Sequence, residues 1–183
     1  MNSTLSNTIH LFEYYKSLGE KAMVQVNDEA LWWTPDEKSN SISLIVKHLN
    51  GNMLSRWTDF LTTDGEKPWR KRDEEFEETI RSREEMMTLW NEGWKCLFDT
   101  LHSLKKEDLE KTINIRNMGQ RVEDAIIRQL THYAYHTGQI VYLARLANEG
   151  NWKSLTIPKG ESETYNADKF KKEKREEHFT KEK

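Results

Sequence analysis

The sequence predicts an all-α protein, a four-helix bundle followed by a charged C-terminal tail. Four long segments carry apolar residues at intervals of three or four, which is the period of an α-helix with one buried face. The chain shows no alternation of strands with helices of the kind that an α/β fold requires. Four amphipathic helices, each with one dominant apolar stripe, bury those stripes by packing together as a bundle.

Start and stop residues locate the four helices. They are expected at about residues 5–26, 42–61, 82–104 and 122–148. Asn27 and Asp28 should end the first helix. Ser41 is a suitable N-cap for the second helix, and Ser82 for the third, because a serine side chain can accept a hydrogen bond from a free backbone N–H. Gly150 is a usual stop for the fourth.

The connections carry turn chemistry rather than long apolar runs. Pro35 lies between the first two helices, and Pro68 bars helix continuation after the second. The stretch TINIRNMGQRV, residues 112–122, alternates weakly and has a glycine near its middle, so a small hairpin is expected there.

The chain of 183 residues suits one helical domain, which we place at residues 1–166. Residues 167–183 are mostly charged. As a helix they would gain only a few tenths of a kcal/mol from each Glu–Lys pair. We therefore expect a tail that is frayed or forms a helical extension.

Composition excludes several classes of protein. The net charge of −3 gives no basic footprint, so nucleic acid is not an expected partner. The single cysteine, Cys96, excludes an internal disulfide and fits a reducing compartment. We find no targeting segment and no apolar run long enough to span a bilayer. These observations predict a cytoplasmic protein without a membrane partner.

Two histidines, His132 and His136, stand four residues apart in the stretch THYAYHTGQI of the fourth helix. This spacing puts both rings on one face, one turn apart, at the border of the apolar stripe. Two interpretations stay open: each ring has found a hydrogen-bond partner in the core, or both bind one metal ion. The residues between them include no glutamate, so the His-Glu-x-x-His arrangement of a metalloprotease is absent.

His48 is the third candidate ligand, because it borders the apolar stripe of the second helix. Three histidines from two helices would hold one divalent transition metal, with Zn, Ni and Fe as candidates, and would leave a coordination position open. Gln129 and Asn52, each one turn from a proposed ligand, are candidates to hold the rings by their other nitrogens.

Two long stretches resemble the DinB/YfiT-like proteins. SISLIVKHLNGNMLSRW is similar to their histidine-bearing second helix, and RQLTHYAYHTGQIVYLARL to their final bundle helix. TDFLTTDGEKPWRKRDEEFE and IPKGESETYN resemble a Bacillus-type branch of that superfamily, and the resemblance covers about residues 5–166. It implies an up-down-down-up bundle, one metal held by His48, His132 and His136, and a homodimer. Relatives include bacillithiol-dependent S-transferases and a mycothiol-dependent isomerase.

Two functional hypotheses follow. The first is a metal-dependent hydrolase or thiol S-transferase acting on a small molecule, with a low-molecular-weight thiol as a second cofactor. Arg70, Lys71 and Arg72 could then hold an anionic substrate, or could simply form a solvated loop balanced by the acids at 73–78. The second is a non-catalytic, metal-bound dimeric module related to stress, which exposed tryptophans would favour. The chain has seven tryptophans, more than a small core needs.

Overall fold

The computed structural model describes residues 3–148 and 150–181 and confirms the predicted helical bundle. The long helices are α1 (Ser3–Met23), α3 (Ile42–Trp57), α4 (Arg83–Ser103) and α5 (Val122–Ala147). The shorter elements are α2 (Asp28–Trp32), α6 (Ser162–Phe170), the strands β1 (Thr112–Ile115) and β2 (Met118–Arg121), and three 3₁₀ turns, η1 (Asp73–Phe76), η2 (Lys106–Glu110) and η3 (Phe179–Lys181).

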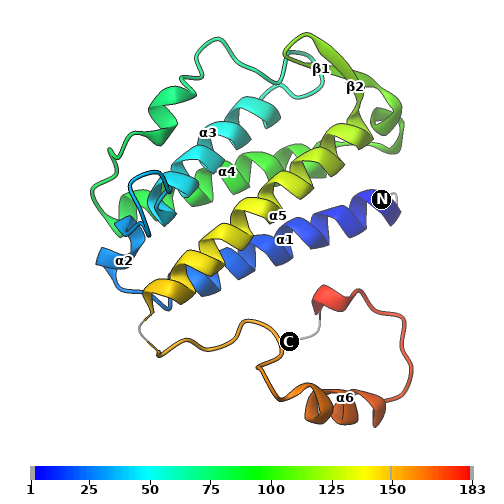
Figure 1. Cartoon of the computed structure of the whole chain (residues 1–183). Coiled ribbons are helices and arrows are strands. Elements are labelled where there is room, and N and C mark those ends of the chain that lie inside the picture. The colour runs from blue at the N-terminus through cyan, green and yellow to red at the C-terminus, as the bar shows by residue number, and fades with distance from the viewer. Residues whose placement is uncertain (1–2, 149, 182–183) are drawn as a thin grey trace.

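The bundle has up-down-down-up topology. Helices α1 and α5 run in one direction and α3 and α4 in the other (Figure 1). Helix α1 packs mainly on α5, and α3 packs mainly on α4. Because α3 and α4 are parallel, the chain between them must run back along the bundle. This crossing segment, residues 58–82, carries η1 and lies against α3.

Aromatic side chains form the centre of the core. Phe12, Trp57, Trp94 and Tyr133 are each less than 2% exposed, and their rings contact one another edge-on or tilted. Such arrangements favour the electrostatics of aromatic rings and bury a large apolar area. Most of the tryptophans therefore pack in or against the core, and the two exposed tryptophans are Trp33 and Trp69.

Two helix ends differ from the sequence prediction. Helix α1 ends at Met23, and Asn27 does not close it but caps α2, its side chain accepting a hydrogen bond from the N–H of Ala30 at 3.0 Å. Helix α3 ends at Trp57 rather than near residue 61. Thr58 is already extended, and Asp59 has a left-handed backbone with φ 49°, so the apolar pattern continues beyond the helix itself.

The predicted hairpin is present as strands β1 and β2 (Figure 1). Its turn is made by Arg116 and Asn117, with φ of 56° and 59°, and not by the glycine, which lies in β2. Two consecutive left-handed residues are characteristic of a type I′ turn, whose twist matches that of the strands. Asp64 of the crossing segment accepts hydrogen bonds from both turn N–H groups at 2.8 Å.

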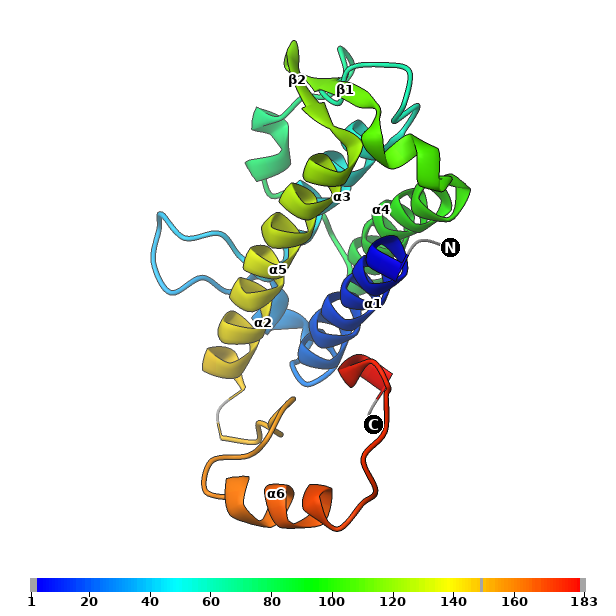
Figure 2. The same ribbon diagram turned by 90° about the vertical axis from the view of Figure 1, so that its right-hand side faces the viewer.

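The chain after α5 lies beyond one end of the bundle, and α6 stands away from the long helices (Figure 2). No residue of α6 is buried, and Phe170 is 86% exposed. The chain then returns to α1, where the Phe179 ring lies 5.6 Å from that of Tyr14. The domain boundary at 166/167 stays a prediction. Across the described residues, every helix falls short of the length and apolarity needed to cross a membrane.

Candidate metal centre

Helix α3 holds His48 at the interior of the bundle. Its start is set by the Ser41 side chain, which accepts the N–H of Leu44 at 3.2 Å as predicted. Helix α4, helix α5 and the crossing segment all pack against α3. Most of its residues are consequently buried, and His48 is only 5% exposed.

Helix α5 brings the other two imidazoles to the same place. His132 and His136 are half-buried, and their Nε2 atoms face each other at 3.1 Å. The His48 ring lies 5.5 Å from that of His132 and 4.9 Å from that of His136, measured between centroids. One ligand nitrogen from each of the three residues lies within 4.8 Å of the others. The structure thus brings together all three predicted ligand residues.

Hydrogen bonds hold two of the three rings by Nδ1. His48 Nδ1 lies 2.9 Å from a carboxylate oxygen of Glu75, and His136 Nδ1 lies 2.7 Å from the amide oxygen of Gln139. An ionised carboxylate and an amide oxygen can only accept, so each Nδ1 must carry the proton. Nε2 of both rings is then left to face the cluster, which is the arrangement usual for histidine ligands of metals.

The third ring, His132, has a different environment. Its Nδ1 is buried and has no hydrogen-bond partner among the described residues, and the same is true of Gln129 Oε1, one turn earlier on α5. Burial, followed by the neighbouring His136 and His48, lowers the pKa of His132 to about 3. Burial and His48 lower the pKa of His136 to about 4. Both rings are therefore neutral near pH 7, and only a neutral imidazole can bind a metal.

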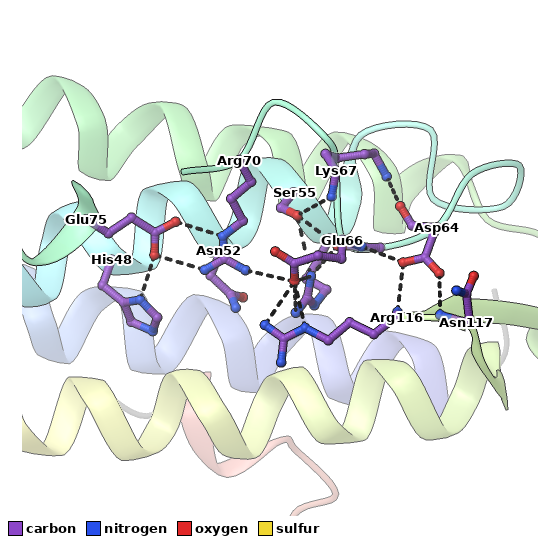
Figure 3. A network of polar contacts seen from close by, with 12 residues as sticks. His48, Asn52, Ser55, Asp64, Glu66, Lys67, Arg70, Glu75, Arg116 and Asn117 are labelled. Carbon is purple, nitrogen blue, oxygen red and sulfur yellow. Dashed lines mark hydrogen bonds and ion pairs between the residues drawn. The ribbon is translucent and has the colours of Figure 1, made fainter. Parts of the chain in front are cut away.

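Glu75 belongs to a wider ion-pair network (Figure 3). Arg70 contacts both of its carboxylate oxygens, with Nε–Oε1 at 2.7 Å and a terminal nitrogen to Oε2 at 2.9 Å. Burial alone would raise the pKa of Glu75, but the hydrogen bonds from His48 and Arg70 outweigh burial and lower it. The network continues through Glu66, which also contacts Arg56 and Arg116. An ionised carboxylate is therefore held on His48 from one side of the site.

Comparison with known families places the chain. The model of a family described as "Protein of unknown function (DUF1572)" matches residues 1–161. The chain belongs to the DUF1572 family. No curated protein and no solved structure is significantly similar to it. The matched residues of this DUF1572 protein include all three histidines and the whole crossing segment.

Neither of the two residues predicted to hold the histidine rings of this DUF1572 protein does so in the structure. The Asn52 side chain accepts the Tyr133 hydroxyl at 3.0 Å, so it stabilises the core beside the site. Gln129 is next to the site but has no partner for its oxygen within the described residues. The residues that do hold rings are Glu75 and Gln139, and Gln139 in turn donates to the Tyr135 hydroxyl at 3.1 Å.

Arg70 and Lys71 of the basic loop differ in environment, and neither anion binding nor a solvated loop describes both of them. The Arg70 side chain is 2% exposed and engaged by Glu75, so it is not a free anion-binding group. Lys71 pairs with Glu74, both more than half exposed, and fits a solvated loop. The interpretation of the acids at 73–78 as uniformly solvated is wrong at Glu75, which is 6% exposed. The sequence around Glu75 carries no signal that sets it apart from Glu74 or Glu77.

The remaining histidines stay outside the site, as predicted. The rings of His10 and His178 lie 5.1 Å apart on α1 and the returning tail, and His102 stacks on Phe98 near the end of α4. They do not join the cluster of His48, His132 and His136.

Proposed function

We propose that the protein binds one divalent transition metal through Nε2 of His48, His132 and His136. The observation that carries this proposal is the common orientation of the rings. Glu75 and Gln139 hold Nδ1 of two of them, and the nitrogens that remain converge from two helices. Imidazole ligands suit Zn, Ni and Fe, which are the metals we expect.

The polar atoms around His132 support this assignment. Without a metal, the close Nε2 pair is satisfied when His132 donates to His136, which leaves His132 Nδ1 as an unpaired buried acceptor. If His132 Nε2 instead binds a metal, Nδ1 carries the proton and becomes a donor. Gln129 Oε1, a buried acceptor one turn earlier on α5 that also has no partner among the described residues, would receive it after a rotation of its side chain. Metal binding therefore offers a use for two atoms that are otherwise costly to bury.

We further propose that the site is catalytic and that the protein is a metal-dependent hydrolase or thiol S-transferase of the DinB/YfiT-like type. Three protein ligands leave a coordination position open, as in catalytic rather than structural sites. A metal there would lower the pKa of a bound water or of a low-molecular-weight thiol, giving a nucleophile near neutral pH. His132 and His136 are only half-buried, so their side of the site is in contact with solvent.

Metal content tests the first proposal. Protein purified without a chelating tag or chelators should contain Zn, Ni or Fe by elemental analysis, and added Zn²⁺ should raise the melting temperature of the metal-free form. Binding to the native state alone stabilises it by mass action. His132→Ala should abolish both effects. A wild-type protein that contains no metal and whose melting temperature does not respond to added Zn²⁺, Ni²⁺, Fe²⁺ or Mn²⁺ would rule out the three-histidine site.

Turnover tests the second proposal, that the site is catalytic. The metal-loaded protein should hydrolyse activated esters or couple bacillithiol to a model electrophile, and His132→Ala should remove the activity. Saturable partner binding without turnover would favour the non-catalytic module instead. The exposed tryptophans give that alternative little support, because Trp33 and Trp69 line different hollows of the surface. We also expect a homodimer, which light scattering coupled to size-exclusion chromatography would reveal.

A further inference from the structure

Gly51 lies on α3, three residues after His48 and therefore on the same side of the helix. A Cβ built at this position would lie 2.7 Å from Glu75 Cδ and 3.2 Å from its Cγ, and closer still to Oε1. Non-bonded carbon atoms do not approach to 2.7 Å. The carboxylate of Glu75 thus occupies the space that any other residue at position 51 would fill.

The Glu75 carboxylate cannot leave this space without losing polar contacts. Arg70 contacts both oxygens of Glu75, and its side chain is 2% exposed. Glu75 is itself 6% exposed, and the next residue, Phe76, stacks its ring on that of His48 at 5.1 Å. Moving the carboxylate away from α3 would break the contact with His48, the contact with Arg70, or both.

A glycine inside a helix destabilises it relative to alanine, so its presence requires a reason. We infer that Gly51 is a positioning residue of the metal centre: it opens a slot in the surface of α3 through which Glu75 reaches His48 Nδ1 and leaves Nε2 free for the metal. The inference rests on the proposed metal site, because a free Nε2 on His48 matters for function only if it binds a metal. Its structural part, the tautomer of His48, can be tested without metal.

The test compares Gly51→Ala with Gly138→Ala in the full-length chain. Gly138 lies on α5, two residues after His136, and a Cβ built there meets nothing within 4 Å. The two substitutions therefore make the same change to helix propensity close to the same site, but only one of them blocks the slot. Circular dichroism establishes that each variant is folded.

The first measurement is the long-range ¹H–¹⁵N spectrum of the histidine rings in the metal-free protein. In the wild type and Gly138→Ala, His48 should carry its proton on Nδ1. In Gly51→Ala, the Nδ1–H form should lose its dominance to the Nε2–H form. An unchanged tautomer in folded Gly51→Ala would overturn the inference, whether or not the protein binds metal.

The second measurement is Zn²⁺ affinity, by competition with a chromophoric chelator. Loss of a residue that orients a metal ligand typically weakens binding by about 10–100-fold. We expect that loss in Gly51→Ala and a change of less than about twofold in Gly138→Ala. Equal affinities of Gly51→Ala and the wild type would contradict the inference, whereas absence of Zn²⁺ binding in the wild type would contradict only the proposed function.

A double-mutant cycle with Glu75→Ala excludes a general packing defect. Once the Glu75 side chain is truncated, a methyl group at position 51 has nothing to displace, so Gly51→Ala should no longer change Zn²⁺ affinity. If Gly51→Ala does not fold alone but folds together with Glu75→Ala, the slot is supported. If Glu75→Ala folds alone but neither protein with Gly51→Ala does, or if the two effects simply add, Gly51 acts by another route and the inference is wrong.

Discussion

Tyr133 shows how closely the core and the candidate site are joined in this protein. Its hydroxyl is buried, donates to Asn52 Oδ1 at 3.0 Å and accepts the indole N–H of Trp57 at 3.0 Å. Burial raises the pKa of Tyr133 well above its usual value, so the hydroxyl stays protonated. Asn52 stands one turn after His48 on α3 but is used by this core network. One line of polar side chains on α3 therefore serves two purposes, the site at His48 and the core at Asn52.

Tyr133→Phe should destabilise the protein by about 1–3 kcal/mol, because removing the hydroxyl leaves a buried amide oxygen and a buried indole N–H without their partner. Urea unfolding of the metal-free protein measures this change in the free energy of unfolding. Tyr142→Phe is the matched control, since Tyr142 is 64% exposed on the same helix and should change stability by less than about 0.5 kcal/mol. Equal stabilities of the two variants would contradict the assigned role of the Tyr133 hydroxyl.

At the scale of elements, the crossing segment is anchored to the hairpin at its beginning. The Asp64 carboxylate accepts backbone N–H groups from Asn117, Glu66 and Arg116 at 2.7–2.8 Å, and Gly65 N–H donates to the Asn114 carbonyl at 2.8 Å. The hydrogen bonds from Asn117 and Glu66 are the main cause of the lowered pKa of Asp64. The hairpin thus holds one end of the segment that delivers Glu75 to His48.

Asp64→Ala should destabilise the protein near pH 6 by about 1 kcal/mol, a modest value for charge-assisted hydrogen bonds because the carboxylate is partly exposed to solvent. The folded pKa of Asp64 lies below its unfolded value of about 3.9. Its contribution is therefore fully present above that value and is lost as the pH falls through the folded pKa. Urea unfolding at a series of pH values should show the difference between wild type and variant shrinking below about pH 4. A difference that stays constant into acid would show that the carboxylate charge is not involved.

In the molecule as a whole, the bundle has a buried core, whereas the helix of the C-terminal segment, α6, has no buried residue. The core is built mainly from the four long helices, with further residues from α2, the crossing segment and the hairpin. The family match ends at residue 161, immediately before α6 begins at Ser162. The charged tail meets α1 through the contacts of Phe179 with Tyr14 and of His178 with His10. This arrangement predicts that the bundle folds and binds metal without the tail.

Removing residues 167–183 should leave the melting temperature within about 4 °C of the full-length value, since changes away from buried features are usually within about 0.5 kcal/mol. Zn²⁺ affinity should also be unchanged, because the described part of the tail includes no residue that contacts the three histidines. Differential scanning calorimetry and the chelator competition check both expectations. A larger loss of stability would show that the tail is part of the folded domain.

Most of the fold was accessible from the sequence because its determinants are local. The apolar period predicted all four long helices, and the serines at positions 41 and 82 marked two of their starts correctly. The pair His132 and His136 was equally visible, since four residues make one helical turn. The end of α3 was misplaced because Phe60 continues the apolar pattern after the backbone has already left the helix at Thr58.

Local sequence patterns were enough to predict the bundle, the pairing of two histidines on α5 and the candidacy of His48. Which acid faces His48 depends instead on how distant elements pack. Glu75 is 27 residues away from it, in a run of acids whose local patterns are alike, and the path of the crossing segment turns Glu75 toward His48. That path depends on contacts with α3 and the hairpin and on the ion pair with Arg70 inside the segment itself, none of which leaves a periodic signal. The same packing gives Gly51 its proposed role, since the close approach of a carboxylate to a helix exists only once both elements are in place.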